Sequence, residues 1–220
     1  MINRFSRIIL DYLLQSKVIE DSEDEKEYYQ YGIEITVSSI LNVVLILLIG
    51  VIFRSVIESI FFLVLFIPIR QFAGGFHADT YFKCNMFFCI LYTMVLWLTN
   101  MTYSFLTTYF VILVSLVCVA LIFYMCPIEH INKPIPKERR KIHKFIATLL
   151  GFIYGISATI LTSFLNRYGA LTLYVLSLVT VLIIVAKVSR KRIISIPDSS
   201  KEEMYELTKK EFGVLGNVLF

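Results

Sequence analysis

Six stretches of the chain are almost entirely apolar and are separated by short polar segments. Crossing about 30 Å of hydrocarbon takes roughly 20 apolar residues, because a helix rises about 1.5 Å per residue. The pattern therefore predicts an all-α, polytopic membrane protein with about six transmembrane helices. We place the spans near residues 33–53, 55–69, 81–99, 103–126, 145–165 and 170–188.

The second apolar stretch is the least regular of the six. It is short, contains Glu58 and ends at Pro68. A carboxylate inside a membrane is costly and normally faces a polar cavity, and a proline commonly ends a helix. The stretch predicts either a full span or a tilted, partly re-entrant segment.

A different period marks the N-terminus, where residues 2–18 have the pattern of an amphipathic helix. Apolar residues recur at spacings of three and four with charged residues between them; they are Ile2, Phe5, Ile8, Ile9, Tyr12 and Leu13. In a membrane protein we expect such a helix to lie in the plane of the cytoplasmic interface. Packing against the cytoplasmic ends of the spans is the alternative.

Composition supports membrane insertion, and charge orients the spans. Apolar residues make up 57% of the chain and the mean hydropathy is +0.74, whereas a soluble domain is about 45–50% apolar. If the N-terminus is cytoplasmic, only Arg54 and Arg167 of the 21 lysines and arginines lie outside, which leaves 19 inside. Cytoplasmic loops carry such an excess of basic residues, so both termini are expected in the cytoplasm.

Much of this charge lies in two basic segments, NKPIPKERRKIHK (132–144) and KVSRKR (187–192). We expect them to rest against anionic headgroups. Nucleic acid is not an expected partner, because the segments lack interleaved aromatic residues. Disulfides are not expected either; apart from one candidate nucleophile, the cysteines are expected to pack as small apolar residues, the four being Cys84, Cys89, Cys118 and Cys126.

One short segment, RQFAGGFHADTYFKC (70–84), interrupts the apolar pattern with polar, reactive and flexible residues. Gly74 and Gly75 permit backbone angles that other residues avoid, so the chain can turn sharply here. Asp79, or the threonine after it, is suited to cap the next helix, which Tyr81 would open. The segment therefore predicts a tight reversal between two spans.

This reversal can carry cysteine chemistry. Cys84 falls near the start of the helix, where free amide groups and the helix dipole favour a thiolate and Lys83 adds a positive charge. His77 is the candidate base, because neutral imidazole can accept the thiol proton and return it to a leaving amine. On one continuous helix the two residues would be about 10.5 Å apart along the axis, so His77 must lie in a loop that folds back. Arg70 can bind a carboxylate bidentately or anchor the end of the second span.

Spacing alone also permits two other classes of protein. Cys126 and His130 stand four residues apart, and with His77 and Cys84 they would complete a Cys2His2 zinc site. A transporter or channel would also use six spans, a glycine-rich re-entrant loop and the intramembrane Glu58. A thiol peptidase needs neither a metal nor another cofactor, so we expect none.

The segment 70–84 resembles the corresponding motif of the accessory gene regulator protein B family of bacterial quorum-sensing systems. The later stretch CPIEHINKPIPKERRKIHK (126–144) and the amphipathic start before six apolar stretches are similar to that family as well. The resemblance implies a membrane peptidase domain over residues 1–190, followed by a cytoplasmic C-terminal tail over 191–220.

The resemblance further implies a cysteine endopeptidase of the bacterial cell membrane that processes a peptide pheromone precursor, with His77 and Cys84 as the catalytic pair. Cys84 would attack the carbonyl after the signal segment, expel an acidic C-terminal tail and pass the acyl group to a cysteine or serine of the peptide, which closes a ring. The implied partners are this precursor, the lipid membrane and a second copy of the chain in a homodimer. Candidates for support or substrate binding are Arg70, Gly74, Gly75, Lys83 and Asp79, the last of which would orient His77.

Overall fold

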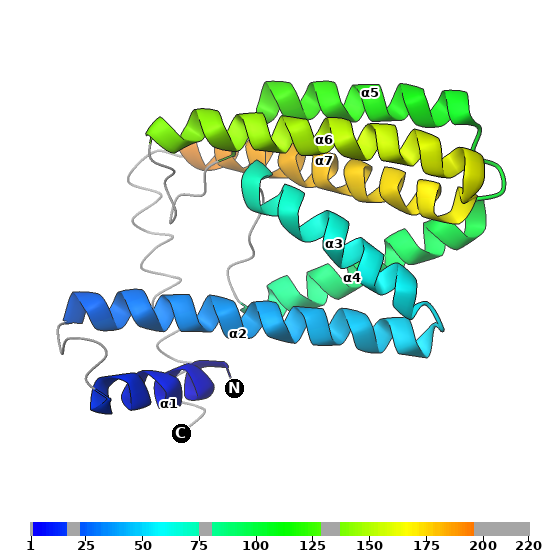
Figure 1. Ribbon diagram of the computed structural model, residues 1–220. Coiled ribbons are helices and arrows are strands. Elements are labelled where there is room, and N and C mark those ends of the chain that lie inside the picture. The colour runs from blue at the N-terminus through cyan, green and yellow to red at the C-terminus, as the bar shows by residue number, and fades with distance from the viewer. Residues whose placement is uncertain (1, 17–22, 75–80, 129–136, 196–220) are drawn as a thin grey trace.

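The computed structural model describes residues 2–16, 23–74, 81–128 and 137–195. Within these ranges the chain forms seven helices (Figure 1): α1 (Ile2–Gln15), α2 (Glu23–Ile52), α3 (Val56–Ala73), α4 (Tyr81–Thr102), α5 (Thr108–Met125), α6 (Lys137–Phe164) and α7 (Asn166–Ser195). Six of them, α2 to α7, contain a segment long and apolar enough to cross a membrane. The expected all-α, polytopic class is therefore confirmed.

The amphipathic helix α1 packs alongside the N-terminal half of α2 (Figure 1). Leu10 is buried in this contact, whereas Ile8 and Tyr12 are exposed. α1 therefore packs on a neighbouring helix, and its expected position in the plane of the cytoplasmic interface stays a prediction. The helix ends at Gln15, before residue 18, and its exposed apolar side chains leave a second face for the interface.

The irregular second apolar stretch is a continuous helix. α3 passes through Pro68 and ends at Ala73, four residues later than the expected end at 69. Proline removes one backbone hydrogen bond, but neighbouring helices make this tolerable within a membrane. The extension places Arg70 inside the last turn of α3 instead of beyond it, and this position determines what its side chain can reach.

Several other helix bounds differ from the hydropathy pattern. α2 begins at Glu23 instead of near 33, and α5 begins at Thr108 instead of near 103. α6 begins at Lys137 instead of near 145, and α7 runs from Asn166 to Ser195 instead of from 170 to 188. The last two helices therefore extend into the basic segments. Charged residues do not end a helix that leaves the hydrocarbon, because water and headgroups solvate their side chains. Hydropathy locates the apolar part of such a helix and misses the rest.

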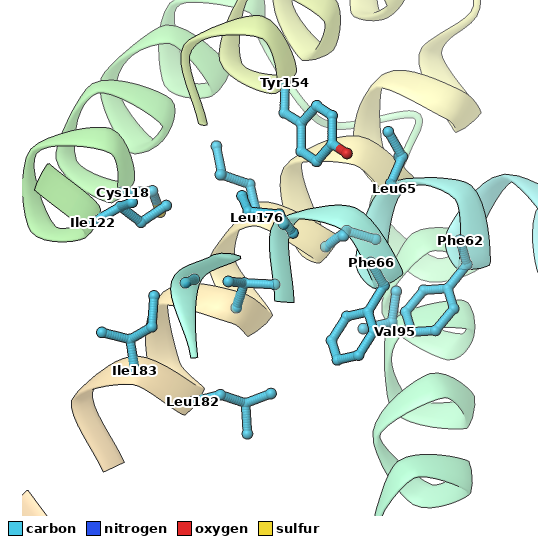
Figure 2. Close-up of a cluster of buried hydrophobic side chains, with 14 of the residues drawn as sticks. Phe62, Leu65, Phe66, Val95, Cys118, Ile122, Tyr154, Leu176, Leu182 and Ile183 are labelled. Carbon is cyan, nitrogen blue, oxygen red and sulfur yellow. The ribbon is translucent and has the colours of Figure 1, made fainter. Parts of the chain in front are cut away.

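α7 is the central helix of the bundle. Its span is 67% buried, compared with at most 44% for the other five spans. It lies beside α5 and α6 on one side, and α3 and α4 pass between this group and α2 (Figure 1). Figure 2 shows side chains of α3, α4, α5, α6 and α7 meeting in the core, among them Phe62, Phe66, Val95, Ile122, Tyr154, Leu176 and Ile183.

Glu58, which was expected to face a polar cavity, instead faces a guanidinium group. The Glu58 carboxylate is buried and lies 3.1 Å from Nε of Arg167 in the first turn of α7. Arg167 also donates a hydrogen bond of 3.3 Å to the Ser55 hydroxyl. The opposite charge offsets the cost of burying the carboxylate. This cluster joins the starts of α3 and α7, at the end of the bundle opposite Arg70 (Figure 1).

Candidate active site

The end of α3 requires glycine at position 74. Gly74 has φ +75°, a left-handed conformation that glycine adopts without strain. A β-carbon at this position would overlap the carbonyl oxygen of Ile128. Ile128, which follows α5, forms an isolated β-bridge with Gly74. Its backbone amide donates a hydrogen bond of 3.1 Å to the carbonyl oxygen of Ala73. The predicted turn is thus present at Gly74, and a segment distant in sequence is bound to it.

Arg70 connects this turn to the candidate nucleophile. Its guanidinium group donates a hydrogen bond to the carbonyl oxygen of Gly74. Its charge also acts electrostatically on Cys84, at the other end of the 70–84 segment. Positive charge near a cysteine is one of the features that favour its thiolate form.

Cys84 lies close to the N-terminus of α4. The helix begins at Tyr81, as expected, so Cys84 is its fourth residue. The first four amide groups of a helix have no partner within it, and they surround this position. The Cys84 side chain is half-buried and Lys83 is exposed. The sulfur can therefore be reached from the end of the bundle while part of its surface is shielded.

A buried hydrogen bond that sequence reasoning missed holds α4 in place. The Ser38 hydroxyl on α2 donates to the side-chain oxygen of Asn85 over 2.9 Å. Both side chains are buried, and Asn85 directly follows Cys84. Their polar character inside apolar spans was a signal that each bonds to another helix, because polar side chains in membrane helices usually do so, but it did not identify the partner.

Gly75, His77 and Asp79 lie outside the described residues. The structure joins Arg70 to Gly74 by a hydrogen bond and lets the charge of Arg70 act on Cys84, which follows the exposed Lys83. The pairing of His77 with Cys84 stays a prediction. What the structure adds is the position of both ends of the connecting segment, at Gly74 and Tyr81.

Cys126 is held as a protonated thiol. It caps the end of α5, where it is buried and donates a weak hydrogen bond of 3.6 Å to the Ala73 carbonyl. Burial raises the pKa of Cys126 to about 12, although Lys144 acts in the opposite direction. A metal ligand must be a thiolate, so this environment is unfavourable to zinc. Among the described residues no three potential ligands come together, while His77 and His130 lie outside that part of the chain.

A further histidine lies near the end of α3. The ring of His143, on α6, meets the Phe72 ring edge to face, with centroids 5.5 Å apart. Its Nδ1 atom is buried and has no hydrogen-bond partner within the described part of the chain. Sequence reasoning passed over His143 because it sits in a basic segment. It provides a second imidazole against which the predicted role of His77 can be tested.

Six apolar helices define a multi-pass membrane protein, and Cys84 near the start of α4, with the charge of Arg70 acting on it, is a candidate thiol site at one end of the bundle. The chain belongs to the accessory gene regulator B family, which it matches over residues 6–188. This assignment confirms the resemblance of its sequence. Members of the family act on peptide precursors in quorum sensing.

Individual relatives agree with the family assignment. An AgrB-like protein 2 of Clostridium perfringens strain 13 is 23% identical over 146 residues, which cover 64% of this chain and 67% of that protein. Protein FsrB of Enterococcus faecalis strain OG1RF is 26% identical over 121 residues, which cover 53% of this chain and only 50% of FsrB. No solved structure matches the chain significantly.

Proposed function

We propose that the protein is a membrane cysteine endopeptidase that removes the C-terminal tail of a peptide pheromone precursor through an acyl-enzyme on Cys84. The observation that carries the proposal is the position of Cys84, a half-buried cysteine in the first turn of α4, on which the charge of Arg70 acts from the end of α3. Family membership supports the substrate class, because the family acts on quorum-sensing peptide precursors.

In the proposed reaction, His77 takes the proton of the Cys84 thiol. The thiolate attacks the carbonyl carbon at the end of the signal segment, and the carbon–nitrogen bond to the tail breaks. His77 returns the proton to the departing amine. The peptide is then held as a thioester, which a thiol or hydroxyl of the same peptide attacks. Ring closure releases Cys84, which regains a proton.

The surrounding residues have supporting roles in this proposal. Amide groups at the start of α4 are suited to bind the oxyanion, because they lack partners within the helix. Arg70 stabilises the Cys84 thiolate, and Lys83 adds positive charge at the exposed side. Gly74 and Gly75 would let the connection turn back toward Cys84, where Asp79 would orient His77.

The proposed site faces the cytoplasm of a bacterial cell, as do both termini. The distribution of basic residues supports this orientation, since 19 of 21 lie on that side. The same charge would attract a precursor with an acidic C-terminal tail by long-range electrostatics. A homodimer, which the resemblance implies, is part of the proposal and is tested by the mass of the detergent-solubilised protein.

Purified variants incubated with the precursor test the chemistry. Cys84→Ala should abolish cleavage and the hydroxylamine-sensitive precursor adduct, whereas Cys89→Ala, a matched thiol removal deeper in α4, should keep both. His77→Gln should reduce cleavage by about 100-fold or more, and His143→Gln should leave it within about twofold. Full cleavage by Cys84→Ala would eliminate the nucleophile, and loss of cleavage in His143→Gln alone would move the base to α6.

A further inference from the structure

A cavity of about 460 Å³ opens between the ends of α5, α6 and α7 that lie on the same side as Cys84. One wall is the end of α5 and the turn after it, including Tyr124 and Ile128. The other wall carries basic side chains of α6 and α7: Arg140, Lys141, Lys144 and Lys187. The cavity is distinct from the candidate thiol site, because neither Cys84 nor Arg70 is among the residues that line it.

The described lining of this cavity is rich in positive charge. Three lysines, Lys141, Lys144 and Lys187, line it together with Arg140, and its described lining residues include no carboxylate. Like charges around a confined space repel one another, and a bound anion relieves this repulsion. A phosphate group suits these lysines better than a single carboxylate, because its several oxygens can accept hydrogen bonds from more than one lysine side chain at once.

The cavity also adjoins an apolar surface. Tyr124, on its rim, is 78% exposed. Further exposed apolar side chains lie on the same turns of α5 and α6 in sequence, namely Phe123, Ile142 and Phe145. The Lys144 ammonium lies 4.4 Å from the centre of the Phe123 ring, so one lysine borders both the charged and the apolar parts. The site is therefore amphiphilic, because the positively charged cavity lies beside apolar side chains suited to contact acyl chains.

We propose that this cavity binds the phosphate headgroup of an anionic membrane lipid, with the acyl chains along α5 and α6. Basic pockets between the cytoplasmic ends of membrane helices are suited to such headgroups. An acidic peptide would satisfy the cations but would leave the adjoining apolar surface unused, so the observations favour the lipid. This site goes beyond the proposed peptidase function, which requires no specific lipid.

Lipid binding would act on the segment that carries the candidate active site. Ile128 lines the cavity and is also bonded to Ala73 and bridged to Gly74. A headgroup bound in the cavity would therefore reduce the motion of Ile128 and, through it, of the end of α3. Because Arg70 belongs to that end, occupancy of the lipid site and the geometry near Cys84 are expected to be coupled.

Native mass spectrometry of the full chain in detergent tests this proposal with dioleoylphosphatidylglycerol as the probe. The wild-type protein should retain one lipid under activating conditions that remove dioleoylphosphatidylcholine. Lys141→Gln and Lys187→Gln should each weaken retention about fivefold, and the pair about 25-fold, since each surface cation contributes about 1 kcal/mol. Arg139→Gln is the matched control, because Arg139 neighbours Arg140 but does not line the cavity, and it should retain the lipid as the wild type does.

Competition experiments distinguish a lipid headgroup from free phosphate and from an acidic peptide as the anion that the cavity binds. If inorganic phosphate displaces the lipid at equal concentration, the cavity is a free-anion site and the lipid proposal is wrong. Protection of the cavity lysines from acylation by a glutamate-rich peptide, without protection by phosphatidylglycerol, would assign the site to a peptide and would also overturn it. Equal loss of lipid in Arg139→Gln would show a diffuse surface effect, contrary to the proposal. The readout is binding, so it is independent of whether Cys84 is a nucleophile.

Discussion

Ser38 on α2 donates a hydrogen bond of 2.9 Å to Asn85 on α4, one residue beyond Cys84. The bond crosses between two helices, and both side chains are buried. Hydrogen bonds between membrane helices contribute about 0.6 kcal/mol on average and up to about 2 kcal/mol. This bond fixes the rotation of α4 about its axis and hence the direction in which the Cys84 side chain points.

If the proposed peptidase is correct, loss of this bond should slow cleavage without weakening precursor binding. Ser38→Ala and Asn85→Ala should each lower kcat about fivefold, corresponding to about 1 kcal/mol, with KM unchanged. Ser38→Thr keeps the hydroxyl and should restore kcat. The matched control is Ser39→Ala, because the Ser39 hydroxyl is exposed and bonds only to the backbone of its own helix at Ile35. A double variant whose loss equals the sum of the single losses would contradict the coupling.

Gly74→Ala should destabilise the protein by about 2 kcal/mol or more, because alanine is strained at this φ and its β-carbon would overlap Ile128. Thermal unfolding in detergent measures the effect. Gly32→Ala is the matched control: Gly32 lies in α2 and has open space around it, so alanine there should be neutral or stabilising by about 0.5–1 kcal/mol. Equal stability of the two variants would show that the contact with Ile128 is dispensable.

The ion pair between Glu58 and Arg167 should contribute to stability but not to chemistry. Glu58→Gln should lower the free energy of unfolding by about 1–2 kcal/mol; this is less than for a fully buried pair, because the Arg167 side chain is 39% exposed. Cleavage per folded molecule should be unchanged, since the pair lies at the end of the bundle opposite Cys84 (Figure 1). A specific loss of cleavage, or of ion flux in vesicles, would give Glu58 a functional role.

Cys126 should remain protonated and dispensable for cleavage. Burial raises its pKa to about 12 from an ordinary value of 9.0, so the folded state keeps this proton longer than the unfolded state does. The resulting stability is fully present below pH 9 and is lost as the pH rises toward 12. Alkylation at pH 8 should leave Cys126 unmodified in folded protein.

Cys126→Ala should keep most precursor cleavage, also in the presence of a strong chelator. It should remove the alkaline loss of stability between pH 9 and 12, whereas Cys118→Ala, the control for a buried thiol in α5, should not. Loss of cleavage in folded Cys126→Ala together with loss of bound zinc would favour the metal site over the thiol peptidase.

Hydropathy predicted the class of fold because a helix that crosses the hydrocarbon must be continuous and apolar, and six stretches of the sequence meet this requirement. It ended the second span too early, at residue 69, whereas α3 continues beyond Pro68 to Ala73. It also failed at Lys137, because a charged helix end projecting from the membrane has the composition of a loop. Both errors concern helix ends, where apolar content no longer decides the structure.

The candidate site was predictable to the extent that it is local. Helix-capping rules placed the start of α4 at Tyr81, and the glycine pair predicted the turn at Gly74. The bond from Ser38 to Asn85 was not predictable, because a serine in an apolar span does not identify its partner on another helix. Nor could spacing reveal that Ile128 packs on Gly74. These contacts depend on how the helices are arranged in space.

The bridge between Gly74 and Ile128 also has a mechanical consequence. The chain enters the segments 75–80 and 129–136 from these two bonded residues, so both connections start from one shared anchor. A displacement of either connection would be transmitted to the other through the backbone contact between Gly74 and Ile128. A substrate bound to the basic connection would in this way displace the start of the segment that leads to Cys84.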